Sequence, residues 1–109
     1  MARDLELKVY SDRRGMHRWK AFAGNGEQLA RSPRGYRKES EIIADINWLL
    51  EEKHDPDVYR DGSAKREYRW RVKKEDGVII AIGSEGYKRR IDCDHAANLF
   101  LDAIPIGEY

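Results

Sequence analysis

Residues 16–50, MHRWKAFAGNGEQLARSPRGYRKESEIIADINWLL, align with residues 67–101, EYRWRVKKEDGVIIAIGSEGYKRRIDCDHAANLFL, at a constant offset of 51 residues. Identical residues at this offset include Trp19/Trp70, Gly26/Gly77, Gly35/Gly86, Tyr36/Tyr87 and Asn47/Asn98. Upstream, Val9-Tyr10 matches Val58-Tyr59 at an offset of 49, so the second copy carries a two-residue insertion in its first turn. One supersecondary unit used twice therefore explains the fold.

The first part of each copy alternates between two kinds of side chain. In 16–23, Trp19 falls on one side while Arg18 and Lys20 fall on the other, and 67–74 alternate in the same way. A period of two with aromatic and β-branched residues is typical of a half-buried strand. Val9-Tyr10 and Val58-Tyr59 mark the preceding strands.

Turn signals follow these strands at Asn25-Gly26 and Asp76-Gly77. Asn-Gly and Asp-Gly are strong hairpin signals, because a type I′ turn needs a positive φ at both central residues. We therefore expect type I′ hairpins that lead into strands at 27–31 and 78–82.

After the Gly-Tyr steps at 35–36 and 86–87, the apolar residues recur every three or four positions instead of every two. This spacing predicts amphipathic helices at about 40–52 and 92–103, with Ser40 and Asp92 as N-caps and Cys93 facing the core. Each glycine is expected to supply a positive-φ turn, and each tyrosine to anchor the connection from strand to helix.

The predicted fold class is α+β: tandem β-β-β-α repeats, whose antiparallel meanders carry two helices packed on one face with pseudo-twofold symmetry. We expect residues 1–109 to form a single domain made of two repeats, about 5–53 and 57–104, because two separate cores of this size would be marginal. The sequence leaves open whether the six strands form one continuous sheet or two three-stranded halves.

The string RWKAFAGNGE at 18–27, followed by a Gly-Tyr step and a helix, resembles the YegP-like family. In the second copy, YRWR at 68–71 matches the first element of the family pattern, whereas KEDGV at 74–78 matches the turn loosely. The resemblance covers about 5–104 and departs from the pattern in the helices. It implies β-β-β-α repeats in a pseudo-dimeric arrangement, a domain of unknown function, and no accepted catalytic residues.

Charge changes sign along the chain although the formal net charge is only +1. Residues 1–38 carry a net charge of +6, 39–57 carry −6, and 58–91 carry +5, while 92–109 contain four acidic residues and no Lys or Arg. Each repeat is therefore basic in its first part and acidic in its last part, a pattern that bears on partner choice.

Composition narrows the class of protein. Apolar runs are too short to span a bilayer, the opening MARDLELK lacks the apolar stretch of a secretion signal, and Cys93 is the only cysteine. We therefore expect a cytoplasmic protein without a membrane segment, a disulfide framework or a cysteine-based zinc site. His17, His54 and His95 are scattered without ligand spacing, so we expect no metal, no cofactor and no catalytic site.

The candidate binding residues are cations on the strands. If Trp19 and Trp70 point into the core, the opposite face of the sheet carries a basic set, with further cations in the loops before the helices. The strand set is Arg18, Lys20, Arg69, Arg71 and Lys73, and the flanking set is Arg34, Lys88 and Arg89.

Two interpretations of this basic face stay open. In the first interpretation, the basic face contacts an anionic partner, such as nucleic acid or an acidic protein surface. Alternatively, it forms only cross-strand ion pairs, for which the available acids are Glu6, Glu27, Glu67 and Glu75. Trp48 lies off the main apolar stripe and is a further candidate for a partly exposed contact surface.

The function predicted from sequence is a small non-enzymatic binding module. The alternative is a self-associating structural protein, a homodimer formed through sheet edges or complementary charge. An enzyme with an unrecognised site is the least favoured hypothesis.

Overall fold

The computed structural model describes residues 5–51 and 53–103, in which three strands and a helix appear twice in the same order. The elements are β1 (Leu5–Ser11), β2 (His17–Ala23), β3 (Gln28–Arg31), α1 (Glu39–Glu51), β4 (Asp57–Arg60), β5 (Tyr68–Lys73), β6 (Ile79–Gly83) and α2 (Arg90–Ala103). Predicted and observed boundaries agree within two residues. Residues 52 and 104, predicted to end the first helix and the second repeat, lie outside the described residues.

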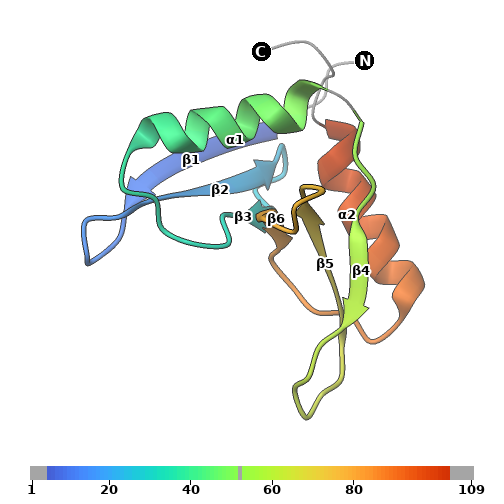
Figure 1. Cartoon of the computed structure of the whole chain (residues 1–109). Helices are drawn as coiled ribbons and strands as arrows, with labels where there is room; N and C mark the ends of the chain where they lie inside the picture. Colours follow the sequence, from blue (N-terminus) through green and yellow to red (C-terminus); the bar gives the residue numbers. More distant parts are fainter. Residues whose placement is uncertain (1–4, 52, 104–109) are drawn as a thin grey trace.

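All six strands form one antiparallel sheet in the order β1-β2-β3-β6-β5-β4, with two helices, so the α+β class is confirmed. The central pairing joins β3 to β6, with Ala30 opposite Gly83 and Arg31 opposite Ile82. This pairing answers the question that the sequence left open, since it makes the sheet continuous. Figure 1 shows α1 running alongside β1 and β2, and α2 running alongside β5 and β4.

The core is built on the two tryptophans of β2 and β5. Trp19 and Trp70 are buried, as predicted, and so is Cys93. Phe100 of α2 contacts both indoles, with ring centroids 6.3 Å from Trp19 and 5.7 Å from Trp70. One helical side chain therefore joins the cores of the two halves, and α2 also packs against β3 of the first half.

The predicted type I′ turns are wrong. Only the glycines of the two dipeptides have positive φ, 88° at Gly26 and 90° at Gly77. Gly26 N donates to Ala23 O at 2.9 Å, and Ala23 N donates to Glu27 O at 2.8 Å. This pattern is a tight turn followed by one left-handed glycine. Asn25 instead accepts the Glu27 N–H on its side-chain oxygen at 2.9 Å, which stabilises the turn without a positive φ.

The Gly-Tyr steps also differ from the prediction, because neither Gly35 nor Gly86 has a positive φ. A Cβ on Gly35 would lie 2.6 Å from the Met16 Cβ, so glycine is required there for close approach. Tyr36 anchors the connection through its backbone, which exchanges two hydrogen bonds with His17, both of 2.7 Å. The second copy repeats this bridge between Tyr68 and Tyr87.

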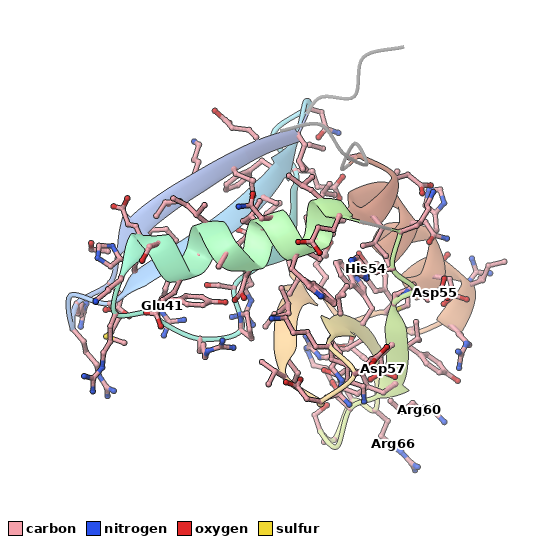
Figure 2. The ribbon with its side chains drawn as sticks, turned by 45° about the horizontal axis from the view of Figure 1, so that its top comes forward. Glu41, His54, Asp55, Asp57, Arg60 and Arg66 are labelled. Carbon is pink, nitrogen blue, oxygen red and sulfur yellow. The ribbon has the colours of Figure 1, made fainter. Side chains whose placement is uncertain are left out.

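Both predicted N-caps are wrong, since Ser40 is the second residue of α1 and Asp92 the third of α2. Each helix starts three residues after its bridged tyrosine, at Glu39 after Tyr36 and at Arg90 after Tyr87, which is earlier than the side-chain pattern indicated. Glu41, at the start of α1 in Figure 2, accepts the Lys38 N–H at 3.0 Å and so supplies one half of a capping box.

Phe100→Ala should lower the free energy of unfolding by about 3–5 kcal/mol, because it empties the space between the two indoles. Urea denaturation followed by far-UV circular dichroism measures the loss. Ile91→Ala is the matched control, since Ile91 is exposed on the same helix and its truncation should cost less than about 1 kcal/mol. Equal losses in the two variants would contradict the central role of Phe100.

Candidate binding face of the sheet

The outer face of the sheet is the side opposite Trp19 and Trp70, where every second strand residue projects. Strand register aligns one residue from each strand in a single row across this face. The row runs Lys8, Lys20, Arg31, Ile82, Arg71 and Asp57, from β1 to β4. Its first half is therefore entirely basic, whereas its second half ends in an acid.

Arg18 and Arg69 occupy matching positions in the two halves, and each is bound by an aspartate from the turn before its strand. The Arg18 Nε lies 2.8 Å from Asp12 Oδ2, and the Arg69 Nε lies 2.8 Å from Asp61 Oδ2. The other carboxylate oxygen of Asp12 accepts backbone N–H groups of its own turn, including Met16 N at 3.0 Å. These two arginines therefore hold turns against strands.

Hydrogen bonds to the carboxylates lower the pKa of both aspartates. The Ser63 hydroxyl and the Arg69 guanidinium lower the pKa of Asp61 from 3.8 to about 2, and Arg18 does most to lower that of Asp12. Both carboxylates stay ionised at neutral pH, so they compensate the charge of the arginines they bind.

Arg71 and Lys73 share one carboxylate, that of Asp57, which Figure 2 labels on β4. Arg71 Nε lies 2.7 Å and Lys73 Nζ 3.5 Å from Asp57 Oδ2. The hydrogen bond from Arg71 is the largest cause that holds the pKa of Asp57 below its usual range. Arg71 also lies over the Tyr59 ring, 4.1 Å from its centroid. In this half of the row, the carboxylate of Asp57 therefore compensates the charge of Arg71.

The acids that the sequence offered as cross-strand partners are mostly wrong. Of that set, only Glu67 pairs with a cation of the strand set, at 3.9 Å from Arg69. The actual partners are aspartates in the turns and on β4, because strand register decides which carboxylate lies opposite each cation.

Lys20 differs from the other strand cations, since it has no ion-pair partner in residues 5–51 or 53–103. Lys8 on β1 and Arg31 on β3 lie directly opposite Lys20. Neither of them has an ion-pair partner among the described residues. The lysines lie over diagonal aromatic rings, Lys20 Nζ 4.9 Å from the Tyr10 centroid and Lys8 Nζ 5.2 Å from that of Phe22. We call Lys8, Lys20 and Arg31 the basic row.

Sequence reasoning missed Lys8 and Arg31 as members of this face. For Lys8 a signal existed, because an inward Val9 places its two strand neighbours on the outer side. For Arg31 a signal also existed, because it ends the strand predicted at 27–31, and it is the last residue of β3.

The flanking cations do not join the basic row. Arg34 donates to Ile79 O at 3.0 Å and lies 3.8 Å from the buried Asp45 of α1. Arg89 forms two hydrogen bonds with Asp92 of α2, at 2.9 and 3.0 Å. Lys88 is exposed beside it.

Trp48 is half-buried, and its ring stacks on His54 at 4.0 Å between centroids. Figure 2 shows His54 with Asp55 in the connection between α1 and β4.

In the described part of the chain, no group of three or more His, Cys, Asp or Glu is placed to hold a metal ion. No helix in that part is long and apolar enough to cross a membrane.

Comparison with known proteins identifies the family. The DUF1508 family, a domain of unknown function, matches residues 63–99. UPF0339 protein NMB1088 of Neisseria meningitidis serogroup B is 49% identical over 55 residues, which cover 48% of this chain and 93% of the relative. The chain belongs to the UPF0339/DUF1508 family. A serogroup A relative, UPF0339 protein NMA1193/NMA1859, matches with the same identity and coverage.

Solved structures of similar fold include two from this group. UPF0339 protein SO3888 from Shewanella oneidensis has a TM-score of 0.70 at 16% identity, over 90% of this chain and 82% of that one. The protein of unknown function yegP from E. coli has a TM-score of 0.68 at 16% identity, over 99% and 89%. The YegP-like resemblance is thereby confirmed, and these two likenesses concern the fold alone.

Asp61→Asn should lower the denaturation midpoint at pH 7, because Arg69 loses its charged partner. Since folding lowers the pKa of Asp61 from 3.8 to about 2, its contribution to stability is present above pH 3.8 and is lost as the pH falls through 2. The difference between wild type and variant should therefore shrink over that range in urea titrations. Asp76→Asn, which copies the Asn25 of the first turn, is the control and should stay near wild type at pH 7.

Proposed function

We propose that this UPF0339 chain is a small non-enzymatic binding module whose outer sheet face takes single-stranded nucleic acid. The observation that carries the proposal is the basic row, three cations in register without a carboxylate partner. Tyr10 and Phe22 flank the row with aromatic rings. Cations along a backbone path, together with aromatic rings on which bases stack, are the two elements of sequence-tolerant single-strand binding.

Energetics favour this interpretation over an ordinary solvated surface. Like charges directly opposite in a sheet are destabilising, so the facing pair Lys8 and Lys20 costs stability unless an anion neutralises it. Contact with an aromatic ring stabilises each lysine by about 0.5–1 kcal/mol, which offsets part of this repulsion, and leaves its ammonium accessible. In the second half the corresponding cation, Arg71, has a carboxylate opposite it on β4. The excess of positive charge is thus confined to one half.

This proposal changes the set of binding residues. Lys20 remains central and is joined by Lys8 and Arg31. The arginines and lysine bound by Asp12, Asp57 and Asp61 are assigned to the scaffold around the basic row, since binding an anion there would first require breaking an ion pair.

The double variant Lys8→Gln with Lys20→Gln should weaken binding to a fluorescein-labelled oligothymidylate. Each lost phosphate contact should reduce the slope of log K against log salt by about 0.7, or about 1.4 for both. Fluorescence anisotropy at several salt concentrations measures both effects.

Lys65→Gln is the matched control, because Lys65 is exposed in the turn between β4 and β5 and should leave the slope unchanged. No binding by the wild type at low salt would overturn the proposal. Binding only to an acidic protein surface would redirect it to that partner class.

Self-association is a second candidate, favoured by the composition of β1. Among the described strands this edge strand pairs only with β2, and its inward residues Leu7 and Val9 stay 40% and 48% exposed. If β1 pairs antiparallel with β1 of a second copy about a twofold axis at Leu7, Glu6 of each copy lies opposite Lys8 of the other copy. The same register places Leu5 opposite Val9, so charge and apolar surface are both self-complementary.

Glu6→Lys should shift the protein toward the monomer, because it places two lysines opposite each other in both pairs. The double exchange Glu6→Lys with Lys8→Glu restores opposite charges and should restore the dimer. Sedimentation velocity over a range of concentrations measures both. A wild type that is monomeric throughout, or a double exchange that behaves as the single variant, contradicts this arrangement.

We also infer that the two halves are copies of one unit folded as a single domain. Supporting observations are the repeated bridges at His17/Tyr36 and Tyr68/Tyr87, and the short relative matched by about half of this chain. Phe100, in contact with both tryptophans, supports a shared core.

A further inference from the structure

A hollow of about 460 Å³ lies between α2, β3 and the connection that leads from β6 to α2. Its lining includes the acids Glu27, Glu85 and Asp92, together with Tyr87, His95 and Ala96. It is distinct from the basic row, since its residues come from the helix side and the ends of strands.

The corresponding place in the first half is filled by the chain itself. Positions 51 residues before Glu85, Tyr87 and Ala96 are Arg34, Tyr36 and Asp45. The Arg34 guanidinium lies over the Tyr36 ring at 4.8 Å and donates to Ile79 O at 3.0 Å. It also lies 3.8 Å from Asp45, whose carboxylate accepts the Tyr36 hydroxyl at 2.6 Å.

In the second half, two substitutions remove this occupant and keep its surroundings. Glu85 replaces the arginine and Ala96 replaces the aspartate, while Tyr87 retains the aromatic ring. Ile79, which accepts the Arg34 hydrogen bond, corresponds to Gln28, which lines the hollow. The hollow therefore keeps the aromatic ring of Tyr87 and the adjacent strand residue Gln28, but it has no counterpart of the Arg34 guanidinium.

The charges of the hollow suit a cation. Asp92 is bound by Arg89, but Glu27 and Glu85 have no cationic partner among the residues that the structure describes. Burial, followed by these two carboxylates, raises the pKa of Tyr87 to about 12. Excess negative charge thus surrounds the ring that matches the one under Arg34.

We propose that this hollow binds the guanidinium group of a ligand, over Tyr87 and between Glu27 and Glu85. The ligand takes the place that Arg34 occupies in the first half. Guanidinium suits this setting because its planar cation stacks on aromatic rings and donates several hydrogen bonds to carboxylates. The group belongs either to a free small molecule or to an arginine within a peptide.

Titration of the ¹⁵N-labelled protein with methylguanidinium and with N-acetylarginine N-methylamide tests the proposal and separates the two sources. Both cations should shift the amide signals of Glu85, Tyr87 and His95 with Kd values of about 10 mM or tighter. Methylurea, a neutral molecule of similar shape, should not shift them. Tighter binding of the arginine derivative indicates a peptide, whereas equal binding indicates a free guanidinium compound.

The double variant Glu85→Arg with Ala96→Asp copies the first half into the second and should fill the hollow. Affinity for methylguanidinium should fall at least tenfold, while the remaining amide signals keep their positions. Glu85→Gln removes only the charge and should weaken binding several-fold, which keeps the test valid if the double variant does not fold. Absence of saturable shifts, or unchanged binding in both variants, overturns the proposal.

Discussion

The packing of Phe100 between Trp19 and Trp70 is the interaction on which the rest of this fold depends. Large aromatic side chains supply most of the apolar burial in a small core, and here a single helical ring reaches the strands of both halves. The Trp70 indole fits because position 83 is glycine, where a Cβ would collide with it. In the first half, Ser32 takes that position, is buried, and its hydroxyl oxygen accepts the backbone N–H of Trp19 at 3.2 Å. The Trp19 indole nitrogen itself is buried without a hydrogen-bond partner in the described residues, a cost that the surrounding core must offset.

On this core the two halves share a scaffold and differ in charge. The pairs Asp12/Arg18 and Asp61/Arg69 perform the same task in both halves, since each holds a turn against a strand. Two of the positions that reverse sign between the first and second halves of the chain bear on the proposed sites. Lys8 corresponds to Asp57 at the offset of 49, and Arg34 corresponds to Glu85 at the offset of 51.

Each of these two reversals leaves charged side chains without an ion-pair partner among the described residues, on the outer sheet face in one case and in the hollow in the other. Because Asp57 pairs with Arg71 whereas Lys8 faces Lys20, the cations of the strand row that lack a carboxylate opposite them lie in the first half. Because Arg34 fills its own site and Glu85 leaves the matching one open, the hollow of the second half is lined by Glu27 and Glu85, which have no cationic partner among the described residues. The proposed sites are therefore places where the first and second halves of the chain differ in charge.

The order of elements, the buried tryptophans and the outward direction of the strand cations could be predicted from the sequence, because periodicity and turn residues act locally. Sequence reasoning misassigned the hairpin type at Asn25-Gly26 and the helix starts at Ser40 and Asp92, where one or two backbone contacts decide the geometry. Which cations are compensated depends on the three-dimensional pairing of the strands, since register places Arg71 opposite an aspartate but Lys20 opposite another lysine. The tertiary structure also decided that the sheet is continuous and that the second half contains a hollow, because both depend on contacts between segments far apart in the chain.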